Sequence, residues 1–341
     1  MPLVPASDLQ ALLTAIYEQH GSPPDEAAEV AAHQVRSHLV GHESHGALRT
    51  EGYLDQIKKG QIIPGAPTDI LVDTPGVTVM DGNWNFGFVV ARRAMRIAVD
   101  KANAFGSSSV IVRRQGHIGR LGEYTAEAAS NGCIAILTAD SGNGPKVAVP
   151  FGGTEPRLGS NPISIAAPSS RGPVVLDMAT TAVAGGKLRV AIAEGKPVPL
   201  GWILDKHGQP TTNPSDLFDG GSMLPLGGDQ AHKGYGLSFM IEILSGILTG
   251  IGYGSDGSGF HNDGTFLAAF SVSHFRPLQE FEAEVDGFID WVKGSGVAEG
   301  FDEILYPGEL EQRLEQGRLK AGIVVDEATW RRLRELGAEA G

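Results

Sequence analysis

The sequence predicts a mixed α/β protein with a central sheet and helical segments at both chain ends. Three observations support this prediction. The first sixty residues show helical patterns, the middle alternates strand-like and helix-like segments, and the last sixty residues return to helices with one short strand. We therefore expect a sheet domain over residues 73–277 and a second, discontinuous helical domain made of residues 1–72 and 278–341.

Three helices are expected at the start of the chain. Ser7 with Gln10 has the spacing of a capping box that opens the first helix. The second is expected to begin at Ser22, with Pro23 at its first helical position. The third covers the run from His45 to Tyr53 and ends near Gly60.

The middle of the chain switches between strand and helix patterns. Residues 70–80, around Pro75-Gly76, predict a hairpin. Asn85 is placed to cap a helix over residues 86–104, and Gly106 suits its end. The other expected elements are strands at 109–114, 133–139, 162–168, 173–178, 264–272 and 322–325, and helices at 121–130, 185–194 and 233–249.

Composition excludes several functional classes. The net charge is −13 and no stretch is rich in Lys and Arg, so nucleic acid and anionic membrane surfaces are poor partners. No apolar run has the length of a membrane span. The N-terminus lacks the basic residues of a secretory signal, and a single cysteine, Cys133 in an apolar run, fits a reducing compartment. We expect a cytoplasmic protein in which Cys133 is a buried hydrophobe.

The run from Ser44 to Tyr53 carries the chemistry most typical of a hydroxy-acid site. If this run is helical, His45, Arg49 and Tyr53 recur every four residues along one face. That face offers a proton carrier near neutral pH, a forked cation that fits a carboxylate, and a phenol. A 2-hydroxy or 2-oxo acid needs such groups, although core packing is an equally good explanation for Tyr53.

A metal site is the competing interpretation of the same region. His38, His42 and His45 follow helical spacings, and Glu43 lies among them. However, the run His-Glu-x-x-His is absent, Gly41 interrupts the helix, and no third or fourth ligand can be placed. We therefore predict no metal, and a packed or solvated role for His38 and His42.

The sequence has no Rossmann fingerprint between a strand and a helix, so a dinucleotide would have to bind at other loops and helix starts. The one literal match, Gly252 to Gly257, follows a helical stretch and precedes no amphipathic helix, so it is expected to be a loop. Better candidates are the glycine-rich residues 152–162, Asp177 with the threonines that follow it, and Lys233 near a helix start. Asp177 is equally suited to cap a helix. For Lys233, the chemistry of the sequence alone favours a solvated lysine.

With these segments assembled, the chain resembles the malate/L-lactate dehydrogenase family, which includes ureidoglycolate, sulfolactate and diketogulonate dehydrogenases and piperideine-2-carboxylate reductase. The resemblance rests on the order of SHGALRTEGYLDQIKKG, LGSNPISIAAP, LDMATT, GWILDKHGQPTTNP, KGYGL and YPGE, which together span most of the chain. It implies NAD or NADP as cofactor, a non-Rossmann fold with a largely antiparallel sheet, and a homodimer with the site near the subunit interface.

The resemblance also implies roles for particular residues. His45 matches a proton donor/acceptor, and Arg49 matches a carboxylate-binding position beside which Tyr53 would contact substrate. His117 matches a second histidine used as acid/base in other members, although this chain has Gln-Gly before it where members often have Asn immediately before the histidine. Cofactor-contacting positions match Ser141, Asp177, Met178, Ala179, Thr180, Thr181, His232, Lys233, Gly308 and Glu309.

We therefore expect an oxidoreductase that transfers a hydride between NAD(P) and a small 2-hydroxy or 2-oxo acid, with His45 or His117 as the acid/base. A cyclic imino acid reductase and a ureidoglycolate or sugar-acid dehydrogenase remain alternatives within the family. A different class, an inactive protein that only binds a nucleotide or an acid, is disfavoured by the presence of both His45 and Arg49. Hydrolase chemistry lacks support, because the sequence has no Gly-x-Ser-x-Gly elbow and no Walker loop.

Overall fold

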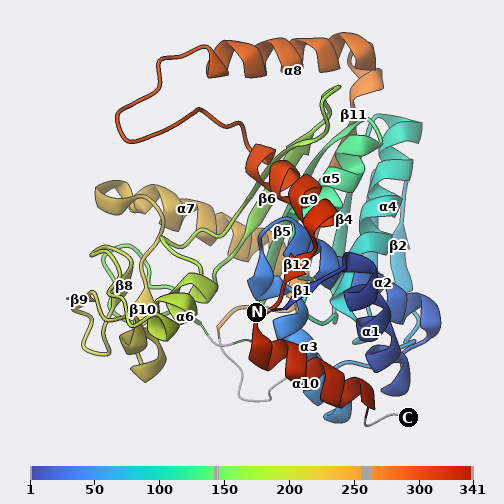
Figure 1. The fold of residues 1–341 in the computed structure, drawn as a ribbon. Coiled ribbons are helices and arrows are strands. Elements are labelled where there is room, and N and C mark those ends of the chain that lie inside the picture. Colours follow the sequence, from blue (N-terminus) through green and yellow to red (C-terminus); the bar gives the residue numbers. More distant parts are fainter. Residues whose placement is uncertain (1, 142–143, 145, 255–262, 339–341) are drawn as a thin grey trace.

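A computed structural model describes residues 2–141, 144, 146–254 and 263–338. A seven-stranded sheet lies at its centre, with the strand order β2-β3-β4-β11-β5-β6-β7 (Figure 1). Every neighbouring pair is antiparallel except β3 with β4. The predicted mixed α/β architecture with a mostly antiparallel sheet is confirmed. The strands are β2 (Asp69–Asp73), β3 (Val77–Asp81), β4 (Ser107–Arg113), β5 (Cys133–Ser141), β6 (Ile163–Ala167), β7 (Val174–Met178) and β11 (Asp263–Ser271).

Helix α4 (Gly87–Phe105) explains the one parallel pair, because it connects β3 to β4 and returns the chain in the same direction. The predicted cap at Asn85 was wrong, because the helix begins one residue later and Phe86 occupies the N-cap position without a side-chain cap. The side chain of Asn85 accepts a hydrogen bond from the adjacent N–H of Phe86 at 2.6 Å. Gly106 ends the helix with φ 99°, as predicted. The hairpin of β2 and β3 around Pro75-Gly76 is confirmed as well.

Two helices cover one face of the sheet and enclose the main core. Helix α4 packs on β4 and β11, while α5 (Gly122–Ser130) packs on β5, β6 and β7 (Figure 1). Strand β4 buries alternate residues, as expected for a strand with one covered face. The core includes Met80, Val110, Tyr124, Leu137 and Leu267, and each large side chain contributes about 1.5–3 kcal/mol by leaving water.

The two ends of the chain meet in a second, helical core. Strand β1 (Leu3–Val4) pairs with β12 (Ile323–Val324), and helix α1 (Ala6–Gln19) packs on both α2 (Pro24–Leu39) and α10 (Glu327–Ala338). Helix α2 also contacts α9 (Glu309–Ala321) (Figure 1). Phe86 and Phe88, at the start of α4, belong to this core. The division of the chain at residues 72/73 and 277/278 stays a prediction; strand β2 crosses the first boundary.

Helix starts depart slightly from expectation. The first helix begins at Ala6 after Pro5, and the hydroxyl of Ser7 bonds to Asp8 instead of capping the helix. The fixed φ of Pro5 prepares the chain for a helix two residues earlier than the capping box suggested. Helix α2 likewise begins at Pro24, after Pro23, and not at Ser22.

A smaller lobe lies beside the main sheet. It contains a three-stranded sheet in the order β10-β8-β9 and helices α6 (Gly185–Ala193) and α7 (His232–Ile241) (Figure 1). The single helix expected over 233–249 changes at Glu242 into a π-helical turn, Glu242–Ile247. The other elements are β8 (Ile203–Leu204), β9 (Pro210–Thr211), β10 (Ser222–Met223), η3 (Pro214–Asp219), η4 (Gly228–Gln230), η6 (Val272–His274) and α8 (Leu278–Lys293).

Of the Gly252–Gly257 run, only the first three residues are described, and Gly252 and Gly254 both have positive φ; its remainder, residues 255–257, lies outside the described residues. None of the helices in the described part of the chain is both long and apolar enough to cross a membrane.

Candidate active site

The run from Ser44 to Tyr53 is not the single helix that its spacing suggested. It consists of two short 3-10 turns, η1 (Glu43–His45) and η2 (Ala47–Arg49), followed by helix α3 (Thr50–Lys58). Gly46 separates the two turns with an extended backbone, φ −90° and ψ −151°. The expectation of one helical face was therefore wrong, because this extended glycine interrupts the helix between His45 and Arg49.

The side chains nevertheless converge, and His117 from another segment joins them. The rings of His45 and His117 are nearly parallel, with centroids 5.7 Å apart and planes at 15°. The hydroxyl of Tyr53 lies 2.8 Å from Nδ1 of His117. The guanidinium carbon of Arg49 is 5.8 Å from the centre of the Tyr53 ring. Residues at 45, 49, 53 and 117 thus form one cluster of imidazole, guanidinium and phenol groups.

The contacts of His117 define which ring nitrogen carries its proton. Nδ1 receives the N–H of Gly119 at 3.3 Å, in addition to the Tyr53 hydroxyl. A backbone N–H can only donate, so Nδ1 is an acceptor and the neutral ring carries its proton on Nε2. Neutral His117 is therefore arranged to donate from Nε2.

His45 is held differently. Its Nδ1 lies 3.1 Å from the hydroxyl of Ser44, which can either donate or accept. Burial, and then the positive charge of Arg49, lower the pKa of His45 to about 3. The imidazole is therefore neutral near pH 7, and a carboxylate beside Arg49 would oppose the second of these causes and raise the pKa.

The phenol of Tyr53 is neutral for a similar reason. Its side chain is buried, and burial raises the pKa of its hydroxyl while Arg49 acts in the opposite direction. A neutral phenol can donate to His117, so Tyr53 both packs in the core and takes part in the cluster. The two roles weighed for it from the sequence are therefore compatible.

The histidines considered for a metal site have other partners. Nε2 of His38 accepts the N–H of Ala47 at 3.0 Å, and Nε2 of His42 lies 3.4 Å from Glu311. Glu43 pairs with Arg318. Within the described ranges, no group of three or more His, Cys, Asp or Glu side chains could hold a metal ion.

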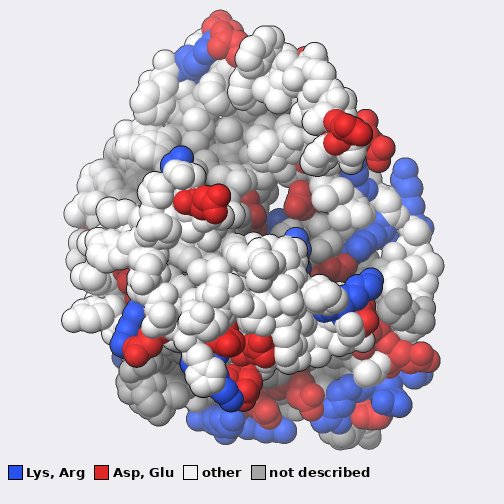
Figure 2. Space-filling view, turned by 90° about the vertical axis from the view of Figure 1, so that its left-hand side faces the viewer, with Lys and Arg blue, Asp and Glu red and all other residues white. Residues whose placement is uncertain are grey.

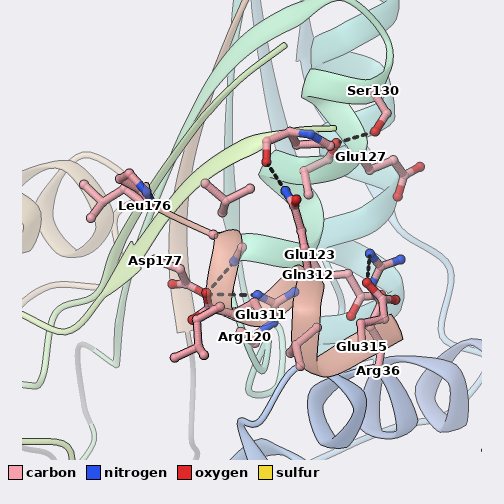
Figure 3. Close-up of a pocket in the computed structure, with 18 of the residues that line it drawn as sticks. Arg36, Arg120, Glu123, Glu127, Ser130, Leu176, Asp177, Glu311, Gln312 and Glu315 are labelled. Carbon is pink, nitrogen blue, oxygen red and sulfur yellow. Dashed lines mark hydrogen bonds and ion pairs between the residues drawn. The ribbon is translucent and has the colours of Figure 1, made fainter. Parts of the chain in front are cut away.

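Asp177 and Gly308, far apart in sequence, line one cavity of about 750 Å³ (Figure 3). The N–H of Val175 on β7 bonds to the carbonyl of Pro307, which places Gly308 against that strand. Asp177 Oδ2 accepts the N–H of Gly122, the first residue of α5, at 2.8 Å. Asp177 lies within β7 and is not the N-cap of a helix, but it satisfies one N–H at the start of α5 from a distant part of the chain while its side chain borders the cavity.

Charges in this cavity are mixed and mostly paired. Five acidic and three arginine side chains line it. Figure 3 shows the side chains of Asp177 and Arg120 directed toward one another, and Arg120 Nη1 is 3.9 Å from Asp177 Oδ2. Burial raises the pKa of Asp177, and Arg120 opposes that shift. The charge of Arg120 also contributes, after burial and Arg49, to the lowered pKa of His45.

The remaining candidate cofactor residues are not among those that line this cavity. The hydroxyl of Thr180 donates to the carbonyls of Ser160 and Asn161, and that of Thr181 to the carbonyl of Val183. Both threonine hydroxyls are therefore already used within the protein. Met178 ends β7, and Ala179 follows it, while Ser141 ends β5.

The candidates later in the chain lie at the starts of two helices, α7 and α9. Thr181 forms a bridge with Pro225, which brings the strand end close to the segment before α7, where His232 and Lys233 begin the helix. The His232 ring lies 5.7 Å from that of Phe151. Lys233 is exposed, as a solvated lysine would be. The carboxylate of Glu309 pairs with Lys293 at 2.6 Å, so it stabilises the start of α9.

Sequence reasoning missed two groups that border the cluster. Arg120, three residues after His117, was not singled out. Neither were His33, Gln34 and Ser37, which form a buried polar face of α2 beside His38. The sequence did carry a signal for these residues, because they form a polar stripe in a helix rich in alanine and valine. Buried polar groups need defined partners, so such a stripe indicates specific contacts.

Comparisons with known proteins identify the family to which this fold and this cluster of side chains belong. A family model described as malate/L-lactate dehydrogenase matches residues 4–334, so the chain belongs to the malate/L-lactate dehydrogenase family. A malate dehydrogenase of Pyrococcus abyssi is 36% identical over 346 residues, covering 99% of this chain and 95% of the relative.

Two further comparisons agree. An L-sulfolactate dehydrogenase of Methanothermobacter thermautotrophicus is 38% identical, covering 93% of this chain and 91% of the relative. The crystal structure of malate dehydrogenase from Entamoeba histolytica superposes with a TM-score of 0.95 at 31% identity, covering 99% of this chain and 98% of that one. The resemblance inferred from the sequence segments is confirmed.

Proposed function

We propose that this protein transfers a hydride between NAD(P) and a small 2-hydroxy or 2-oxo acid. The observation that carries the proposal is the convergence of His45, His117 and Tyr53 beside the Arg49 guanidinium, in a chain of this family. The set supplies proton transfer, hydrogen-bond donation and a carboxylate partner, which are the groups that such an acid requires.

In the oxidative direction, Arg49 binds the substrate carboxylate, ideally through two parallel hydrogen bonds. His45 removes the hydroxyl proton as C2 loses hydride, and in reverse its imidazolium returns that proton to the carbonyl oxygen. The bound carboxylate raises the pKa of His45 from its low value, because it offsets the charge of Arg49. His117 donates a hydrogen bond from Nε2 to the reacting oxygen and is oriented by Tyr53.

Two of the candidate cofactor residues, Asp177 and Gly308, line a cavity that is compatible with part of a dinucleotide. The cavity volume of about 750 Å³ lies within the usual range for ligand sites, and Nε of the buried Arg120 has no hydrogen-bond partner among the described residues. The residues that would hold NAD(P) are Ser141, Asp177, Met178, Ala179, Thr180, Thr181, His232, Lys233, Gly308 and Glu309. When bound, this cofactor supplies the acceptor or donor of the hydride.

The test is a panel of 2-hydroxy acids with NAD⁺ and NADP⁺, and of 2-oxo acids and cyclic imino acids with NADH and NADPH, followed by the near-ultraviolet absorbance of the reduced cofactor. Turnover of a 2-oxo acid supports the proposal. Turnover of only an imino acid, ureidoglycolate or a sugar acid would favour those alternatives. Cofactor or acid binding without oxidation or reduction across the panel would identify an inactive binding protein.

We also propose that the protein is a cytoplasmic homodimer. Phe239 and Met240 on α7, and Ile247 and Leu248 after it, are exposed apolar side chains. Figure 2, seen from the side of α6 and α7, shows a broad surface with few charged groups. Such a surface is typical of an interface between subunits. Light scattering after size exclusion should give twice the mass of one chain, and the mass of a single chain would refute the dimer.

A further inference from the structure

Two buried histidines on helix α2 each accept a backbone N–H from a segment that carries a proposed catalytic histidine. His38 Nε2 accepts from Ala47 at 3.0 Å, two residues after His45. His33 Nε2 accepts from Arg120 at 3.1 Å, three residues after His117. We infer that His38 and His33 are positioning residues that set the backbone of these two segments. The inference rests on the proposed function.

The same local arrangement occurs at both sites. In each, a glycine lies against the histidine ring and the next residue donates its N–H. A Cβ added to Gly46 would lie 2.4 Å from the ring of His38, and one added to Gly119 would lie 2.4 Å from Nε2 of His33. Only glycine lets the backbone approach the rings this closely. The glycine after each candidate acid/base residue thus has a specific packing partner on α2.

The first segment is held at both ends of one peptide unit. The carbonyl of Gly46 accepts from Nε2 of Gln34 at 3.1 Å, while the N–H of Ala47 donates to His38. Because the peptide is planar, two hydrogen bonds at opposite ends define its orientation. This peptide lies between His45 and Arg49 in the chain, so its orientation sets the directions in which both side chains leave the backbone.

The protonation state suits this acceptor role. A backbone N–H only donates, so Nε2 of each histidine is unprotonated and the proton lies on Nδ1. Burial lowers the pKa of His33 to about 4 and lowers that of His38 as well. Nδ1 of His33 lies 3.1 Å from Glu123, which also pairs with Arg92. Both rings are therefore neutral acceptors near pH 7.

Paired substitutions test the inference by kinetics. His38→Leu and His33→Leu remove the acceptor but retain apolar bulk, whereas His38→Gln and His33→Gln return an acceptor oxygen. We expect His38→Leu to lower kcat and raise KM for the acid, each by roughly tenfold to a hundredfold, because both His45 and Arg49 move. His33→Leu should lower kcat but leave that KM within about twofold, because Arg49 lies on the other segment. The Gln variants should recover most of each loss.

His20→Gln is the matched control, because His20 follows α1 as its C-cap residue and its side chain bonds only to the nearby carbonyl of Ile16 among the hydrogen bonds described. Its kinetics should equal those of the wild type. Unchanged kinetics in both Leu variants of an active enzyme would overturn the inference, as would equal losses in the Leu and Gln variants.

A spectroscopic measurement separates this inference from the proposed function, because it needs no activity. In nitrogen NMR of the unliganded full chain, Nε2 of His33 and His38 should show the shift of an unprotonated ring nitrogen. Amide exchange should accelerate at Ala47 in His38→Leu and at Arg120 in His33→Leu. A protonated Nε2, or unchanged exchange, would overturn the inference even if a Leu variant folds poorly. Wild-type protein inactive across the panel would instead refute the proposed function.

Discussion

The hydroxyl of Tyr53 and Nδ1 of His117 lie 2.8 Å apart, although the two residues are 64 positions apart in the chain. The Gly119 N–H reaches the same nitrogen, so the histidine ring has a defined tautomer and orientation. Helix α3 supplies the phenol and the loop after β4 supplies the imidazole. This contact joins the helical core at the chain ends to the central sheet at the candidate site.

Removing this hydroxyl should slow turnover without weakening substrate binding. Tyr53→Phe leaves His117 with one donor at Nδ1, and the loss of one hydrogen bond corresponds to about 1 kcal/mol, or a roughly fivefold lower kcat. KM for the acid should change little because Arg49 remains. Steady-state kinetics on the preferred acid would measure both constants. Tyr253→Phe, at an exposed position, is the control; an unchanged kcat in Tyr53→Phe would remove Tyr53 from the mechanism.

Substitution of each histidine should separate the proton carrier from its partner. We expect His45→Ala to lose roughly a hundredfold or more in kcat, the usual scale for a general acid or base. His117→Ala should lose less, since it donates a hydrogen bond without exchanging the substrate proton in our proposal. Single-turnover rates with saturating substrate would compare them. Near-normal turnover in His45→Ala would assign the acid/base role to His117.

The carboxylate contact can be tested at Arg49. Lysine keeps the charge but cannot reproduce the two-donor fork, so Arg49→Lys should raise KM for the acid by roughly tenfold with a smaller change in kcat. The decisive comparison is a substrate analogue that lacks the carboxylate. If the variant loses as much activity on the analogue as on the acid, Arg49 does not bind the carboxylate.

Asp177 should contribute both to the stability of the fold and to cofactor binding, and two variants can separate these contributions. Asp177→Ala removes the acceptor for the N–H of Gly122 and should lower the free energy of unfolding by about 1 kcal/mol. Asp177→Asn keeps an acceptor oxygen and should retain most of that stability. Both should raise KM for the cofactor. Denaturant unfolding and cofactor titration would measure the two effects, and a normal cofactor KM in both variants would leave only the role at the start of α5.

Stability should depend on pH through His33. Its pKa is lowered from 6.5 to about 4 in the folded protein, so the unfolded chain binds more protons between these values. The contribution of neutral His33 to the free energy of unfolding is therefore fully present above pH 6.5, and it is lost as the pH falls toward 4. Relative to His33→Gln, the wild type should lose about 1.4 kcal/mol per pH unit in this window. Urea unfolding of both proteins across the window would measure this difference, and a constant difference would contradict the lowered pKa.

Much of the fold could be predicted because its signals are local. The apolar run of β4, which buries alternate residues, and the glycine that ends α4 at Gly106 depend on neighbours in the sequence. Predictions failed where a short-range conformation overrode a pattern. Gly46 is extended between two turns, and the helix after α7 widens into a π-helical turn at Glu242. Neither departure alters the spacing of apolar residues, so periodicity could not reveal it.

The sequence by itself determined the order of elements and the local grouping of His45, Arg49 and Tyr53, because a few intervening residues keep them close in any compact chain. Only the tertiary structure decided that His117 joins them and that His33 and His38 on α2 support the two segments. It also decided that His45 is neutral, since removal from water and nearby guanidinium groups lower its pKa. Desolvation and contacts between distant segments exist only after the chain has packed.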